Sequence, residues 1–251
     1  LSKEIIEFIN YTLFLPKIKK TFLEQLFNED FTSNLEHLIE NGVIIFNPEE
    51  QDYNYNSSFV PILNEHFFAL PVEKKELYLG KITSLIEEDI SEGFLTILIK
   101  AKLYNQAIEY LKNNYEYYFK NHLYETIENL TSSLIKVEPK NYFLIYLQLR
   151  LYRFTGKIND ALALYRQFEN TELTPEIELE IGICEAISGN FKLSISKLSK
   201  LEKANNLELH DYLYLINCLG ISYQQTHQLD IALEYFLKAV KLTLSLEPNL
   251  K

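Results

Sequence analysis

Two arginines three residues apart are the strongest candidates in this sequence for contacting a ligand. Arg150 and Arg153 are two of only three arginines in the chain, and Phe143, Tyr146 and Phe154 lie in the same segment at helical spacing. Guanidinium groups beside aromatic rings suit a carboxylate, a phosphate or an acidic peptide. The alternative is that the arginines pair with acidic residues on adjacent helices. In a chain of net charge −11, both interpretations remain open.

A second group of side chains that could hold a ligand lies near the end of the chain. Tyr214, Asn217 and Gln224 recur at helical spacing in the segment 209–226, and Ile221 lies between them. An Asn or Gln side chain can hydrogen-bond to the backbone of a bound peptide. Polar positions that only contact solvent have the same composition, so this alternative also remains open.

No grouping of side chains in the sequence supports catalysis or the binding of a metal or cofactor. The five histidines contain no pair at the i, i+4 spacing of a metal-binding helix. The sequence has neither Gly-x-Ser-x-Gly nor a Gly-rich loop that ends in Lys-Ser or Lys-Thr. Cys184 and Cys218 are predicted to be small core residues rather than a redox pair. We therefore expect no enzymatic activity, no catalytic residue, no metal and no cofactor.

The charge and the distribution of apolar residues narrow the classes of partner. With 24 basic and 35 acidic residues, the chain has the wrong sign for nucleic acid or an anionic membrane surface. No apolar run approaches the roughly 18 residues that would span a bilayer, and no secretion signal opens the chain. Two cysteines fit a reducing cytoplasm. Because the chain begins with Leu1 and lacks methionine, we interpret it as a piece of a longer polypeptide.

The composition predicts a mainly helical protein that begins with a small mixed domain. Apolar residues make up 47% of the chain, whereas glycine and proline occur only seven times each. Apolar periodicity predicts helices at 3–13, 16–27 and 32–40, then a hairpin at 43–58. A further helix begins after Pro61. This order of elements within residues 1–70 is typical of a winged-helix domain.

The charge of this first domain disfavours direct binding to DNA. Residues 1–70 carry four basic and eleven acidic side chains. The segment 32–40, which would be the recognition helix, has no Lys or Arg. Because contacts to phosphates require cations, we predict that the domain is a structural coupler between other domains.

From residue 71 onward the sequence predicts helices alone, joined by short breaks. The predicted ranges are 73–88, 91–103, 105–119, 122–137, 141–155, 158–170, 175–188, 191–204, 209–226 and 229–246. A succession of helices with one apolar face each suggests repeated pairs that bury these faces against their neighbours.

The last helices resemble the tetratricopeptide pattern, in which a Leu-Gly pair precedes aromatic and small residues at fixed spacing. The residues that carry it are Leu219-Gly220, Tyr223, Ala232, Phe236 and Ala239. Equivalent positions at Leu149, Gly182 and Gly220 lie 33 and 38 residues apart. The resemblance implies a right-handed superhelix with a concave inner surface. It also places the candidate ligand-binding residues on that surface, namely Phe143, Tyr146, Arg150, Arg153, Tyr214, Asn217 and Gln224.

The order of elements also resembles the regulators related to the bacterial maltose-regulon activator, which are signal-transduction ATPases with several domains. The segments 59–63, 104–111 and 155–165 carry this resemblance. It implies that a nucleotide-binding domain precedes the winged helix, that the repeats act as a sensor, and that an effector domain often follows. Val60 stands where many family members have a His that reaches the nucleotide, so the resemblance carries no nucleotide contact to this domain.

These patterns together predict a winged-helix-like domain at 1–70 and a tetratricopeptide-like domain at 71–251. The predicted function is a non-enzymatic sensor or interaction module of a bacterial transcriptional or signalling regulator. A small inducer, a peptide or a protein would bind the concave face and shift the packing of the repeats on the winged helix. Other domains of a longer chain are the further predicted partners. The alternative is a standalone scaffold that binds a peptide or protein without nucleotide control.

Overall fold

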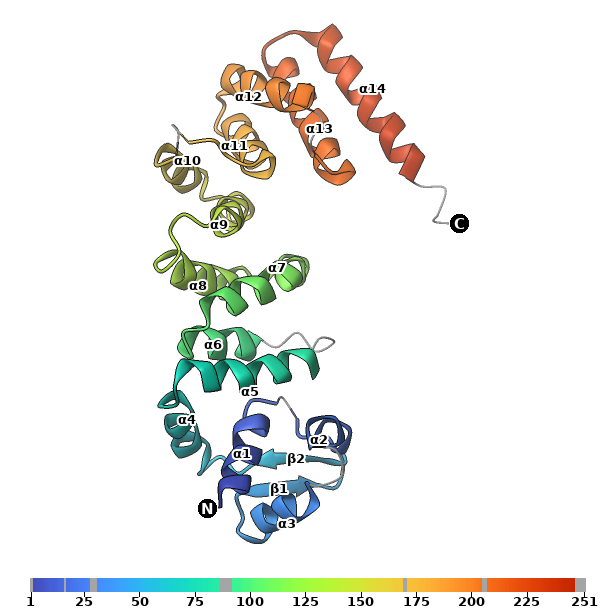
Figure 1. The fold of residues 1–251 in the computed structure, drawn as a ribbon. Helices are drawn as coiled ribbons and strands as arrows, with labels where there is room; N and C mark the ends of the chain where they lie inside the picture. The colour runs from blue at the N-terminus through green and yellow to red at the C-terminus, as the bar shows by residue number, and fades with distance from the viewer. Residues whose placement is uncertain are drawn as a thin grey trace. The chain divides into compact units, whose positions relative to one another are not determined.

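The structure is a computed structural model that describes residues 2–15, 17–27, 31–85, 92–168, 171–204 and 207–246. These residues form fourteen helices and one two-stranded sheet (Figure 1). The chain divides into two compact units, Leu1–Thr126 and Ile127–Lys251. None of the helices described is both long enough and apolar enough to cross a membrane.

The first unit contains the hairpin and most of the shorter helices. Its elements are α1 (Lys3–Thr12), α2 (Lys20–Phe27), α3 (Thr32–Glu40), β1 (Ile44–Asn47), β2 (Asp52–Tyr55), α4 (Val60–Phe68), α5 (Val72–Leu85), α6 (Glu92–Lys100) and α7 (Tyr104–Lys120). Ser2 caps the first helix, because its hydroxyl oxygen accepts a hydrogen bond from the N–H of Ile5 at 3.3 Å. The predicted order of three helices, a hairpin and a further helix is confirmed, while its assignment as a winged helix stays a prediction.

The first unit continues past the change in sequence pattern at residue 70. Strands β1 and β2 pair antiparallel, with Ile44 opposite Tyr55. Helix α1 packs on α5, where the rings of Tyr11 and Tyr78 meet edge to face at 4.6 Å. The boundary predicted at residue 70 separates a mixed pattern of helices and strands from a purely helical pattern. The division after Thr126 instead separates two compact units.

The second unit is a stack of paired helices, α9 with α10, α11 with α12 and α13 with α14 (Figure 1). Helix α8 (Tyr124–Ile135) crosses the division after Thr126. The helices that follow are α9 (Tyr142–Phe154), α10 (Ile158–Arg166), α11 (Pro175–Ile187), α12 (Phe191–Ala204), α13 (Leu209–Gln225) and α14 (Leu229–Leu246). The first helices of successive pairs pack side by side, because α11 contacts both α9 and α13. The helices predicted from residue 71 onward are confirmed to within a few residues at their ends wherever the structure describes them.

The turn that follows the first helix of each pair has one geometry throughout the stack. Gly156, Gly189 and His227 all have positive φ, at 74°, 86° and 63°. In each turn the next residue donates its N–H to a carbonyl five residues back, as Lys157 does to Tyr152 at 2.8 Å. This is the Schellman arrangement, which satisfies the last carbonyls of a helix. The three positions are 33 and 38 residues apart, so the turns repeat in the register that the sequence predicts.

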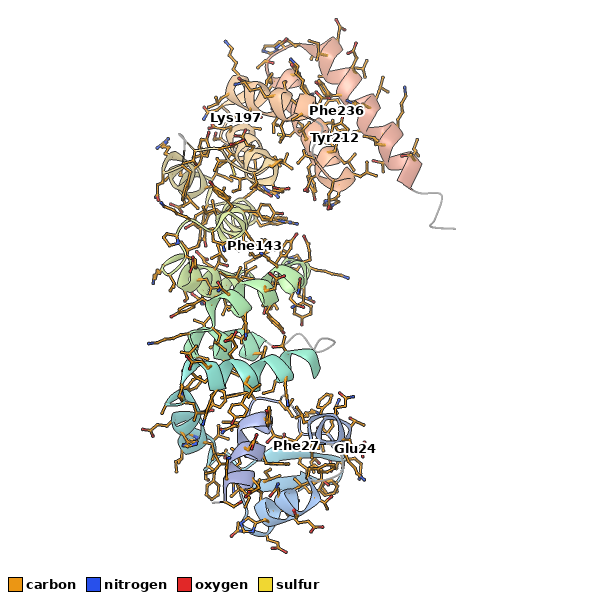
Figure 2. The ribbon with its side chains drawn as sticks, in the orientation of Figure 1. Glu24, Phe27, Phe143, Lys197, Tyr212 and Phe236 are labelled. Atoms are coloured by element: carbon orange, nitrogen blue, oxygen red, sulfur yellow. The ribbon has the colours of Figure 1, made fainter. Side chains whose placement is uncertain are left out.

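The core of the stack lies between the helices of each pair and between neighbouring pairs. One cluster comprises Ile145, Leu149, Ala161, Leu162, Ile177, Ile181 and Cys184, and the next contains Leu179, Leu198, Leu201, Leu215, Leu219 and Ala239. Gly220 allows α13 and α14 to approach closely, since a Cβ atom there would lie 2.7 Å from the ring of Phe236. Phe236 projects from α14 in the last pair (Figure 2). Both cysteines are buried and free, Cys184 within the first cluster.

Candidate functional site

A pocket of about 290 Å³ opens on the first helices of the three pairs. Its lining residues are Arg153 of α9, Ile183, Ala186 and Ile187 of α11, and Tyr214, Asn217, Cys218 and Ile221 of α13. Residues three and four positions apart share one face of a helix, so α11 and α13 each contribute one continuous face. Ile187 and Ile221 leave 56% and 47% of their surface exposed, which makes them accessible apolar groups.

Arg153 is the charged group of the pocket, and a carboxylate of the neighbouring helix neutralises it. Its Nε atom donates to Glu180 Oε2 at 2.6 Å and its second terminal nitrogen to Oε1 at 3.0 Å. The Arg153 side chain is 14% exposed and that of Glu180 only 5%. The guanidinium also lies 4.6 Å from the ring centre of Phe154 and 5.9 Å from that of Tyr214. Burial lowers the pKa of Arg153, but the hydrogen bonds that it donates to Glu180 more than compensate and raise the pKa, so the group stays charged.

Asn217 provides a neutral polar group in the same pocket. Its side chain is exposed on α13, and within the described part of the chain its amide has no hydrogen-bond partner. An Asn amide both donates and accepts, which is the pair of functions that a peptide group of a ligand requires. The pocket therefore combines apolar walls with one unused amide and one neutralised ion pair.

The Cys218 thiol lacks the features of an activated nucleophile. Burial raises its pKa, and burial also raises the pKa of Cys184 to about 12, so both thiols stay protonated. The sulfur of Cys218 lies 3.9 Å from the hydroxyl oxygen of Ser194. Among the residues that the structure describes, no three His, Cys, Asp or Glu side chains are grouped to hold a metal ion.

A comparison with solved structures identifies the type of repeat. YrrB, described as a tetratricopeptide protein with an unusual peptide-binding site, matches this chain with a TM-score of 0.52 and 16% sequence identity. The match covers 74% of this chain and 92% of YrrB. Neither the family models nor the curated proteins that were compared gave a match. At this identity the likeness establishes the fold. The chain has a tetratricopeptide-like helical repeat.

In the tetratricopeptide-like stack, three of the seven candidate residues predicted from the sequence meet in the pocket. They are Arg153, Tyr214 and Asn217. The pairing of Arg153 with Glu180 on the adjacent helix is the arrangement that the sequence left open as the alternative to ligand binding.

The other four candidates lie outside the pocket lining. Arg150 donates a hydrogen bond to the hydroxyl of Tyr146 at 2.5 Å, and its guanidinium lies 5.9 Å from the ring centre of Phe154. Phe143, labelled in Figure 2, is a half-buried residue near the start of α9. Gln224 is exposed near the end of α13.

Sequence reasoning missed the part of the pocket that α11 provides. Ile183, Ala186 and Ile187 lie one, four and five residues after Gly182, so the repeat register already placed them beside the inward face of α13. Their apolar side chains gave no signal of their own, because core and pocket residues of a helical repeat have the same composition. Glu180 was missed for a different reason: an acidic residue two positions before a repeat glycine looks like any solvated helix residue.

Proposed function

We propose that the stack of α9 to α14 is an interaction module whose pocket accepts one large apolar side chain of an extended protein segment. The observation that supports this proposal is the pocket itself. Five of its eight lining residues are apolar. The amide of Asn217, which has no partner among the described residues, lies beside these apolar side chains. The apolar wall would contact the ligand side chain, while Asn217 would hold a neighbouring peptide group.

The neutralised arginine favours this ligand over a free carboxylate or phosphate. An anion would have to compete with Glu180 for Arg153, and displacing a buried carboxylate from its partner is strongly unfavourable. A sugar is a poor fit as well, because its hydroxyl groups would lose water to an apolar wall without finding enough partners. A volume of about 290 Å³ also lies at the lower end of the range for small-molecule pockets.

Selection of peptides from a random display library against the purified chain tests this function. We expect enriched sequences that share an aliphatic or aromatic residue, and calorimetry with one synthesised peptide then gives its dissociation constant. Ile187→Glu and Ile221→Glu place a charge against the apolar ligand at exposed positions, so each should weaken binding at least about tenfold.

Leu193→Glu is the matched control for these two variants. Leu193 is 45% exposed, lies on α12 and does not line the pocket, so the same change of charge should leave the affinity unchanged. Circular dichroism checks that all three variants keep their helices. If no peptide is enriched, or if the three variants bind alike, the pocket is not the binding site.

The regulator context is a wider proposal that rests on the order of elements in residues 1–70. Three helices, a hairpin and a further helix support the interpretation of this segment as a winged-helix coupler, and the resemblance to the maltose-regulon activator family supports a sensor role for the repeats. In this proposal an inducer, peptide or protein on the repeats controls other domains of a longer chain. The sequence of the complete gene tests it, because a phosphate-binding loop encoded upstream is expected and its absence favours the standalone scaffold.

A further inference from the structure

Helix α14 presents an uninterrupted apolar stripe on the side that α13 does not cover. The residues of the stripe are Leu229, Leu233, Leu237, Val240 and Leu244, and they are 63%, 58%, 52%, 55% and 61% exposed. Their spacing of four, four, three and four residues keeps them on one side of the helix. A row of large exposed apolar side chains flanked by charged ones marks an interaction surface.

The adjacent side of α14 is already used for packing within the stack. Ala232 and Ala239 are buried, at 2% and 5% exposure, and Phe236 contacts α13 at Gly220. The stripe therefore does not contribute to the pairing of α13 with α14. It also lies away from the pocket, none of whose lining residues belongs to α14.

In the preceding pair of helices, the surface equivalent to the stripe is packed against the next pair. Leu233, Leu237 and Val240 stand 38 residues after Ile195, Ser199 and Glu202 of α12. Those three residues are half-buried, because the following pair packs over them. Glu202, for example, accepts hydrogen bonds from Tyr212 at 3.4 Å and Tyr235 at 2.8 Å. On α14 the equivalent surface is more apolar, yet no described residue covers it.

Two charged residues beside the stripe indicate which partner would pack against it. Glu234 and Lys241 are exposed, seven residues apart, and form no ion pair with any residue that the structure describes. Two α14 helices that pack antiparallel about a two-fold axis place Leu237 of one copy opposite Val240 of the other, and Leu233 opposite Leu244. This register brings Glu234 of each copy beside Lys241 of the second copy, and the symmetry makes the contact twice. In a parallel pair, by contrast, Glu234 would lie beside Glu234 of the second copy and Lys241 beside Lys241, so like charges would meet.

We propose that the apolar stripe of α14 is a self-association surface that packs antiparallel against α14 of a second copy of this chain. In this register residues 233–244 of the two copies face one another, which is a contact of about three helical turns. A contact of this length is short for a coiled coil, so the dimer should be in exchange with the monomer. The stripe lies outside the proposed peptide site, so self-association and peptide binding can each fail without the other.

Sedimentation velocity of the 251-residue chain over a concentration series tests the association. We expect a shift from monomer to dimer as the concentration rises. Glu234→Lys and Lys241→Glu each create two repulsive contacts in the antiparallel dimer, so each variant alone should associate at least about tenfold more weakly. An equimolar mixture of the two variants should restore association, because a mixed dimer again pairs opposite charges at both contacts.

The mixture distinguishes this arrangement from any other dimer. Lys200→Glu is the matched control, since it makes the same change of charge at an exposed position of α12 and should leave association unchanged. Circular dichroism establishes that every variant is folded. A chain that stays monomeric at all concentrations overturns the proposal. So does a dimer that resists both charge reversals, or a mixture that associates no better than either variant alone.

Discussion

Gly182 on α11 lies so close to Leu198 on α12 that a Cβ atom at position 182 would stand 2.3 Å from Leu198 Cδ2. Real Cβ atoms do not approach another heavy atom so closely. The Leu198 side chain is completely buried, so it has little room to move away. This contact explains in physical terms why the repeat places a glycine here: the absence of a side chain lets the two helices of the pair meet.

Gly182→Ala is therefore expected to lower the free energy of unfolding by about 1–3 kcal/mol, the usual range for overpacking a dense core. Gly80→Ala is the contrasting variant, because Gly80 is also helical but has no atom within 4 Å of its would-be Cβ. There the gain in helix propensity should raise stability by roughly 0.5–1 kcal/mol. Urea unfolding monitored by circular dichroism measures both changes, and equal effects at the two positions would contradict the packing argument.

His227→Gly is expected to stabilise the turn between α13 and α14. His227 has a φ of 63°, in the left-handed region where Gly156 and Gly189 stand in the two earlier turns. Relief of that strain, less the added freedom of glycine in the unfolded chain, should raise the unfolding free energy by roughly 0.5–1 kcal/mol. At His122, which also has positive φ, the gain should be smaller because its ring hydrogen-bonds to Tyr124 at 3.0 Å. Thermal unfolding of both variants compares the two gains.

Arg153→Met should destabilise the stack strongly, by roughly 3–5 kcal/mol, because it leaves the carboxylate of Glu180 buried without its partner. The double variant Arg153→Met with Glu180→Met removes both charges and should recover most of that loss. Urea unfolding of the single and double variants forms a thermodynamic cycle. Similar losses for both variants would show that the pairing is not the origin of the effect.

The junction of α12, α13 and α14 should weaken in acid through Glu202. Burial raises the pKa of its carboxyl, but hydrogen bonds from Lys238, Tyr235 and Tyr212 outweigh this and lower the pKa below its usual value. A lowered folded-state pKa means that the contribution is complete above the unfolded value and is lost as the pH falls through the folded value. Glu202→Gln should therefore reduce stability at neutral pH and flatten its decline in acid.

The same pH series on Glu172→Gln provides the control for Glu202. Glu172 is exposed and makes no hydrogen bond or ion pair within the described part of the chain. Its replacement removes one carboxylate without removing a contact. An equal flattening in both variants would show that the acid response does not arise from the contacts of Glu202.

The sequence alone determined the helices, the hairpin and the register of the repeat. Each depends on local chemistry: apolar residues at helical spacing, a β-branched and aromatic run at 43–46 followed by a turn and an alternating strand, and glycines where a turn needs positive φ or where two helices meet. The repeat register also placed Arg153, Tyr214 and Asn217 on the inward faces of their helices, and these three residues do line the pocket.

The tertiary structure alone decided how those faces meet. Whether Arg153 is available to a ligand depends on Glu180, which stands 27 residues away in the sequence and within hydrogen-bonding distance in the fold. Whether an isoleucine is core or pocket wall depends on the neighbouring pair, as Ile181 is fully buried while Ile187 is largely exposed. Periodicity specifies the direction in which a side chain leaves its helix. The distance and angle between packed helices specify what it meets there, and these follow from contacts between segments that no local pattern encodes.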